Sequence, residues 1–341
     1  MVETDNLTTI IADRIKKAQK KEVFFEELYS NSDLPIGKNE FVYFIKPEIT
    51  IESDKIKLED ILELMFKQIE SFGFHVHNIK ILSAAYLEKY DIIADHYGVI
   101  NKISSNAIQN MSELAKEKLK DIYGRDERKI KTLGGNEFLN AYPVFNAYSL
   151  DYLWQNLKNN KIASGTYCEQ VKVDDKIVYL INGFAPRQIK HYTEIGRSIV
   201  VFTLSGDISW KDARDKFIGA TNPLDAKEGS LRRILLERRE EFGLAEISQA
   251  INGCHLSAGP VESLIELKRY NSNFSKDMEG LDYTYFQFGN KLKKLFQNDF
   301  DNIISNMSVL HEGKRVSIFD LTEEKDSDEA IELLKQIFFN R

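Results

Sequence analysis

A histidine stands in the stretch QAINGCHLSAGPVE, residues 249–262, among small and turn-forming residues. An imidazole in such a place can act as a nucleophile, whereas a lone histidine beside glycine and serine is more often a structural residue. Cys254 precedes His255, but adjacent side chains on an extended backbone point to opposite faces, so we expect no Cys–His catalytic pair. The residues around His255 leave the nucleophilic and the structural roles open.

Two arginines lie at the start of an expected helix in KEGSLRR, residues 227–233. If Ser230 caps that helix, Arg232 and Arg233 fall in its first turn, where the helix dipole disfavours each cation by roughly 0.3–1 kcal/mol. A bound anion would reverse this penalty, because helix N–H groups and a guanidinium together form a phosphate site. The alternative is that both arginines extend into solvent near acidic neighbours.

Two further patterns give weaker signals. His75 and His77 share one face of an expected strand and could bind a metal ion, but no third ligand follows at a recognisable spacing, so packing is favoured and no metal site is expected. The stretch LGGNEF, residues 133–138, lacks the Walker pattern of a phosphate loop. We interpret it as a turn.

The composition indicates a soluble globular protein. With 341 residues, of which 43% are hydrophobic and 29% charged, the chain can form one large domain or two smaller ones. A net charge of −7 argues against a broad basic surface for nucleic acid but leaves small anionic ligands open. Two cysteines make no disulfide framework, and no stretch is long and apolar enough to cross a bilayer. We expect a cytoplasmic protein with neither nucleic-acid nor membrane partners and no targeting segment.

The elements that position these residues begin with an N-terminal extension, residues 1–37, in which 7–30 is predicted to be an amphipathic helix. A strand is predicted at 40–47, a helix at 56–72, and an alternating strand at 73–82. The core therefore opens as β–α–β.

The middle of the chain carries an insertion. A helix is predicted at 84–98, and the insertion follows at about 101–183. It ends in a hairpin whose strands are joined at Asp174 and Asp175.

Regular patterning resumes with a central strand at 197–206 and a helix at 210–219. Further helices are predicted from Leu231 and from Pro260, because proline suits the first helical position. Residues 271–341 form a mostly helical C-terminal extension.

Four short motifs stand out within residues 38–270: FVYFIKP at 41–47, the pair His96–Tyr97, GATNPLDAKEGSLR at 219–232 and NGCHLSAGP at 252–260. In this order and spacing they resemble a nucleoside diphosphate kinase. The stretch FVYFIKP is similar to the family's first strand, which places Lys46 on the phosphate-binding lysine. His96 and Tyr97 are similar to the family's HY pair, which places Tyr97 on its active-site tyrosine.

The strongest part of the resemblance lies between residues 219 and 266. GATNPLDAKEGSLR resembles the family's GETNPADSKPGTIR without a gap, which places Thr221 and Arg232 on residues that contact phosphates. NGCHLSAGP resembles the family's NxxHGSDSP.

The second of these motifs carries the reactive group. It places Asn252 on the nucleotide-contacting asparagine and His255 on the phosphorylated histidine. Counted without a gap from His255, Glu266 meets the glutamate that orients the imidazole.

The resemblance implies an α+β fold with a ferredoxin-like βαββαβ core, an antiparallel sheet with helices on one face, helical extensions and an inserted hairpin-containing segment. It implies that His255 takes the γ-phosphate of a nucleoside triphosphate and passes it to a nucleoside diphosphate, with Mg²⁺ carried by the nucleotide phosphates. Glu266 would orient the ring, and Lys46 and Arg232 would stabilise phosphate charge. Tyr97, Thr221 and Asn252 would position the phosphates. The family is usually oligomeric, so we expect a homo-oligomer.

The chain also departs from the family. Asp215 stands where the family has an arginine, between Arg214 and Lys216, and neither neighbour is an automatic substitute because one residue rotates a helical side chain by about 100°. Leu256, Ala258 and Glu48 replace other family residues, and the segment between Arg232 and Asn252 is longer.

The insertion lies in the region that contacts the nucleotide base in the family. Phe184 is a candidate for the aromatic residue that stacks on this base. Three alternatives to the kinase hypothesis remain, and Asp215 and the insertion motivate the first two. The protein could be a nucleotide-binding module without efficient turnover, a phosphohistidine transferase with another acceptor, or a protein in which these side chains are purely structural.

Overall fold

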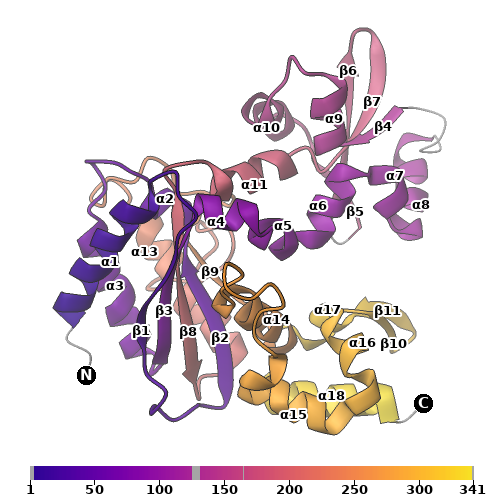
Figure 1. The fold of residues 1–341 in the computed structure, drawn as a ribbon. Helices are drawn as coiled ribbons and strands as arrows, with labels where there is room; N and C mark the ends of the chain where they lie inside the picture. Colours follow the sequence, from indigo (N-terminus) through magenta and orange to yellow (C-terminus); the bar gives the residue numbers. More distant parts are fainter. Residues whose placement is uncertain (1–3, 125–130, 164, 340–341) are drawn as a thin grey trace. The chain divides into compact units, whose positions relative to one another are not determined.

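The computed structural model describes residues 4–124, 131–163 and 165–339 (Figure 1). The chain forms two compact units, the first made of residues 1–90 and 195–341 and the second of residues 91–194. The second unit extends beyond the predicted insertion, 101–183, at both ends. Its first residue, Asp91, interrupts the helix predicted at 84–98 with a left-handed φ of 52°, which aspartate tolerates better than most residues.

The first unit contains a five-stranded antiparallel sheet in the order β1-β3-β8-β2-β9. Its strands are β1 (Phe25–Ser30), β2 (Asn39–Ile45), β3 (His75–Ser83), β8 (Ser198–Gly206) and β9 (Cys254–Leu256). Two helices connect β2 to β3, a short helix and then the whole second unit connect β3 to β8, and a helical segment connects β8 to β9. The predicted β–α–β start and central strand are therefore present.

Helices cover both faces of this sheet (Figure 1). The helices of the first unit before the C-terminal extension are α1 (Thr4–Ala18), α2 (Pro47–Thr50), α3 (Leu58–Ser71), α4 (Ala84–Lys89), α12 (Trp210–Asp212), the π-helix η1 (Ala213–Ile218), α13 (Leu231–Glu237) and α14 (Pro260–Asn271). Tyr43 and Ile45 of β2 point into a core shared with α1 and α3. Phe44 points the other way and contacts Tyr270 of α14, with ring centroids 5.3 Å apart. The expectation of helices on one face was therefore wrong, because β2 is apolar on both sides and buries both.

The N-terminal extension contains a strand where the sequence predicts helix. Helix α1 ends at Ala18, and Phe25–Ser30 forms edge strand β1, paired with β3. The aromatic residues Phe25 and Tyr29 favour a strand, but only the pairing with β3, which lies far away in sequence, decides between strand and helix. The helix predicted across 7–30 is therefore wrong after Ala18.

The C-terminal extension docks on the first unit. Its elements are η2 (Tyr283–Tyr285), α15 (Gln287–Phe296), η3 (Gln297–Asp299), α16 (Phe300–Ile304), β10 (Ser308–His311), β11 (Lys314–Ser317), α17 (Ile318–Thr322) and α18 (Ser327–Phe339). It is mostly helical, with one β-hairpin that the sequence did not predict. Glu40 of β2 accepts a hydrogen bond from the N–H of Phe288 at 2.8 Å, which fixes the start of α15 on the sheet.

The second unit contains a four-stranded sheet in the order β4-β7-β6-β5. Its elements are α5 (Ile92–His96), α6 (Gly98–Ser105), α7 (Ala107–Asn110), α8 (Glu113–Tyr123), β4 (Lys131–Gly134), α9 (Gly135–Ala141), α10 (Ala147–Gln155), β5 (Asn160–Ala163), β6 (Thr166–Val173), β7 (Lys176–Ile181) and α11 (Ala185–Thr193). The predicted hairpin is confirmed: β6 pairs with β7, and Asp174 and Asp175 both have positive φ, as a tight hairpin turn requires. LGGNEF is the junction of β4 and α9, not an isolated turn.

No helix in the described parts of the chain is both long enough and apolar enough to cross a lipid bilayer.

Candidate active site

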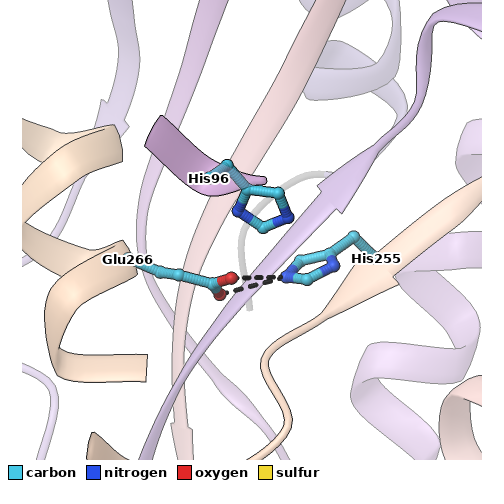
Figure 2. A group of neighbouring side chains, drawn as sticks. All are labelled: His96, His255 and Glu266. Atoms are coloured by element: carbon cyan, nitrogen blue, oxygen red, sulfur yellow. Dashed lines mark hydrogen bonds and ion pairs between the residues drawn. The ribbon is translucent and has the colours of Figure 1, made fainter. Parts of the chain in front are cut away.

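His255 and Glu266 form a direct contact in the first unit (Figure 2). His255 lies in β9, and Glu266 lies in α14 on the face of the sheet that carries Phe44. The Nε2 atom of His255 is 3.0 Å from each carboxylate oxygen of Glu266. A ring N–H donated to this buried carboxylate places the proton on Nε2 and the lone pair of the neutral imidazole on Nδ1. Figure 2 also draws His96, which belongs to the second unit.

A stacked aromatic ring holds the imidazole from another side. Phe44 and His255 are register partners in the β2–β9 pair, and their rings stack with centroids 4.4 Å apart at 19°. Cys254 and Leu256, on either side of His255, point into the core on the opposite face. Burial raises the pKa of Cys254 to about 11, with a smaller opposing effect from Arg232, so its thiol stays protonated at neutral pH. Cys254 and His255 are thus on opposite faces, as alternation requires.

Ser257 supports Glu266 and was missed by the sequence analysis. Its Oγ donates to Oε2 of Glu266 at 2.6 Å and accepts the N–H of Val42 at 3.2 Å. Glu266 is 1% exposed, so a second donor offsets part of the cost of burying a carboxylate. The signal was available in the motif, because Ser257 lies two residues after His255 and alternation returns it to the same face.

Lys46 lies at the end of β2 beside the chain that leads into β9. Its backbone is extended, and its N–H donates to Gly253 O at 2.9 Å. Its Nζ donates to Oδ1 of Asn252 at 2.7 Å. Burial lowers the pKa of Lys46 to about 8; nearby Glu48 opposes this shift, whereas Arg232 adds to it. In the described part of the chain, no carboxylate lies within ion-pair range of Lys46.

Asn252 connects Lys46 to the loop after η1. The side-chain amide of Asn252 is buried and donates to Thr221 O at 3.0 Å. Thr221 itself is exposed. One side chain therefore joins the lysine to the loop that contains the GATNPLDAKEGS stretch.

Arg232 lies on the first turn of α13 and is almost entirely buried. Its guanidinium donates to Gly219 O at 2.9 Å and to Cys254 O at 3.0 Å. Arg233, by contrast, pairs with Glu237 at the surface. The alternative that both arginines extend into solvent near acidic neighbours therefore holds for Arg233 and is wrong for Arg232. Ser230 does not act as the predicted cap, because its hydroxyl donates to Lys227 O instead of accepting a helix N–H.

Glu48 is a second residue that the sequence analysis did not place in the site. Its Oε1 accepts the N–H of Gly253 at 2.6 Å. Gly253 has a φ of 82°, and a Cβ there would lie 2.5 Å from Leu235, so glycine is required on both counts. Glu48 therefore fixes the backbone two residues before His255.

Asp215 and its neighbours point to different partners. They lie in η1, the π-helix, a conformation that changes the rotation per residue and often occurs at functional sites. Asp215 pairs with Lys227, Lys216 with Asp212, and Arg214 with glutamates of the C-terminal extension.

Tyr97 and Phe184 belong to the second unit. Tyr97 joins α5 to α6, and its hydroxyl lies 3.3 Å from that of Tyr192. Phe184 precedes α11 and packs against Trp154 and Tyr167. The structure thus gathers Lys46, Thr221, Arg232, Asn252, His255 and Glu266 in the first unit, and these two aromatic residues in the second.

His75 and His77 are in β3, where a register shift lies between Val76 and Asn78. His77 lies 2.7 Å from the hydroxyl of Ser205, and burial lowers its pKa. Within the described residues of the first unit, no three possible metal ligands converge on this pair.

No protein-family model and no curated protein matches this chain. One similar solved structure is the crystal structure of an NDP kinase from Pyrobaculum aerophilum. The identity is 17%, the match covers 73% of this chain and 100% of that chain, and the TM-score is 0.33. A TM-score this low does not indicate a function, which must be inferred from the side chains of the site.

Proposed function

We propose that the protein is a phosphotransferase of the nucleoside diphosphate kinase type, which moves the γ-phosphate of a nucleoside triphosphate to a nucleoside diphosphate through a phosphohistidine at His255. One observation carries the proposal. The imidazole of His255 contacts a buried carboxylate through Nε2, and two buried cationic side chains donate hydrogen bonds to the residues just before it in the chain, Lys46 to Asn252 and Arg232 to the carbonyl of Cys254. This set fits a nucleophile for an anionic phosphoryl group.

In the first half-reaction, Nδ1 of His255 attacks the γ-phosphorus in line. An N–P bond forms, the bond from phosphorus to the β–γ bridging oxygen breaks, and the diphosphate leaves with that electron pair. In the second half-reaction, a terminal oxygen of an acceptor diphosphate attacks the same phosphorus and the N–P bond breaks. Glu266 compensates the positive charge that the ring acquires when Nδ1 is phosphorylated.

Lys46 and Arg232 supply positive charge at the site. Their burial strengthens their interaction with phosphate oxygens, because little solvent screens it. Asn252 and Thr221 position the phosphates, and Mg²⁺ enters as part of the nucleotide substrate. We propose that Tyr97 contributes a phosphate contact and Phe184 a stacking surface for the base.

The strand order also supports the proposal. Numbering β2, β3, β8 and β9 as strands 1 to 4, their order in the sheet is 2-3-1-4, with β1 added at the edge. This is the order of a ferredoxin-like βαββαβ core, here with a whole unit inserted between strands 2 and 3. We further propose a homo-oligomer in the cytoplasm, with no nucleic-acid or membrane partner.

A second candidate is a nucleotide-binding module without efficient turnover. The ion pair between Asp215 and Lys227 favours it, because a carboxylate there neutralises a cation of the 219–230 loop. A change of phosphate acceptor is the related alternative.

The test is to incubate the protein with Mg²⁺ and γ-labelled ATP or GTP, and then to add unlabelled nucleoside diphosphates. We expect acid-labile, base-stable label on the parent, loss of that label into the added diphosphates, and no label on a His255→Ala variant. His311→Ala serves as the matched control, because His311 lies on the hairpin of the C-terminal extension. Nucleotide binding without label would support the binding module, and label that no diphosphate removes would support another acceptor.

A further inference from the structure

Residues 322–327, which join α17 to α18, lie directly on the turn that follows His255. The N–H of Glu324 donates to Ala258 O at 2.9 Å. Gly259 has an extended backbone, with φ −169° and ψ 172°, which any residue can adopt. A Cβ on Gly259, however, would lie 2.5 Å from Thr322 O and 3.1 Å from the Cα of Glu323. The close approach of residues 322–327 therefore explains why this position needs glycine.

The peptide groups of Ala258 are held from two directions. Its N–H donates to Oε2 of Glu262, on the first turn of α14, at 2.9 Å. Its C=O accepts the Glu324 N–H. The turn is thus fixed between α14 and the C-terminal extension.

An ion-pair group ties residues 322–327 to the π-helix. Arg214 of η1 lies 3.1 Å from Glu323 and 3.6 Å from Glu324, and its side chain is 26% exposed. The glutamates are 45% and 43% exposed, so solvent screens the group in part, but three charges in one network contribute more than an isolated surface pair.

The far end of the segment is anchored on α12 and on the first residue of β2, the strand that carries Phe44. The carboxylate of Asp326 accepts the N–H of Trp210 at 2.9 Å and the side-chain amide of Asn39 at 3.1 Å. Ser327 donates its N–H and its hydroxyl to Oδ1 of Asn39, both at 2.9 Å. These groups are buried, so the anchor holds residues 322–327 at the start of β2.

We propose that residues 322–327 position the His255 site: by holding the 257–259 turn they fix α14 relative to β9, and so fix Glu266 relative to the imidazole. Gly259 and Arg214 are then positioning residues. Because β2 holds β9 and α14 is a continuous helix, the turn is the adjustable part of the path from His255 to Glu266. This positioning role refines the proposed function. It rests on that function only where the rate of His255 labelling is measured.

Two variants test this positioning role. Gly259→Ala pushes residues 322–327 away from the turn, and Arg214→Gln removes the ion pairs without touching the core. Arg239→Gln is the matched control, because the ion-pair partner of Arg239 among the described residues is the exposed Glu240. The readouts are the imidazole nitrogen and N–H signals of His255 by NMR in the nucleotide-free protein, the rate of His255 labelling, and the nucleotide Kd.

We expect both variants to shift the Nε2–H signal and to slow labelling by about tenfold to a hundredfold, as small misplacements of a reacting group do. The nucleotide Kd stays unchanged, because Lys46 is held by Gly253 and Asn252 by Thr221, both outside the 257–259 turn. Unchanged His255 signals in folded Arg214→Gln would overturn the proposal, even if Gly259→Ala failed to fold. If the parent is never labelled, the proposed function fails, and the NMR signals alone still decide the positioning role.

Discussion

The Nζ atom of Lys46 lies 2.7 Å from Oδ1 of Asn252, and this contact joins the end of β2 to the residues that lead into His255. Both side chains are buried, and the lysine reaches the site through an extended backbone that keeps it on the face of Phe44. A cation held in this way is available for phosphate only while it is protonated.

The charge of Lys46 therefore sets a pH limit on nucleotide binding. Because burial lowers the pKa of Lys46 to about 8, the side chain loses its charge as the pH rises through 8, and we expect the ATP Kd to increase between pH 8 and 9.5. Calorimetric titrations at several pH values measure this. Lys46→Gln should bind more weakly at pH 7 and show little change above pH 8, and exposed Lys276→Gln should follow the parent. A parent-like pH dependence in Lys46→Gln would contradict the assignment.

Removal of the Ser257 hydroxyl should destabilise the first unit. Ser257→Ala leaves Oε2 of Glu266 and the N–H of Val42 without this partner, which costs about 1–3 kcal/mol in buried surroundings. Urea unfolding measures the loss, and exposed Ser275→Ala should change stability by less than about 0.5 kcal/mol. Equal stability of the two variants would argue against the hydrogen bonds.

Glu266→Gln should slow phosphorylation without abolishing nucleotide binding. The amide can still accept a hydrogen bond, but it carries no charge to balance the imidazolium, and it can turn its NH₂ group toward the ring. We expect the labelling rate to fall by about a hundredfold. Exposed Glu332→Gln should label like the parent, and an unchanged rate in Glu266→Gln would exclude a role for the carboxylate.

Glu262 makes stability depend on pH in the opposite sense to most carboxylates. Burial first, and then the charge of Glu266, raise the pKa of Glu262 from 4.5 to about 7. The folded protein thus binds more protons than the unfolded chain between these values, so the free energy of unfolding falls as the pH rises from about 4.5 to 7 and levels off above it.

Glu262→Gln should remove this part of the pH dependence and raise stability above pH 7 relative to the parent. Urea unfolding at pH 5, 6, 7 and 8 tests it, with exposed Glu279→Gln as the control. A variant that keeps the parent's slope between pH 5 and 7 would show that another group titrates there.

Local sequence patterns predicted the helices and strands whose conformation does not depend on distant parts of the chain. The apolar runs of β2 and β8 and the helical spacing of α3 appear in the sequence at nearly their observed bounds. The positive φ values of Asp174 and Asp175 likewise follow from the turn chemistry between two alternating strands. Edge strand β1 was missed because pairing with distant β3, not local propensity, decides its conformation.

In the candidate site, too, the sequence indicated contacts between residues that are close along the chain but not contacts between distant segments. His255 and Glu266 lie in one short stretch and meet through a single turn. The contact between Gly259 and Thr322, in contrast, joins segments far apart in sequence, and an extended glycine carries no local sign that another backbone lies against it. The π-helix at Ala213–Ile218, which sets the directions of Arg214 and Asp215, has no comparable sequence signal.

The most direct test of the central claim is to identify the phosphorylated atom. After incubation with Mg²⁺ and a nucleoside triphosphate, base digestion and separation of the two phosphohistidine isomers report which nitrogen of His255 carries phosphate. Because Nε2 contacts both oxygens of Glu266, we predict phosphate on Nδ1 in the parent and none in His255→Ala. Phosphate on Nε2, or no phosphohistidine in protein that binds the nucleotide, would contradict it.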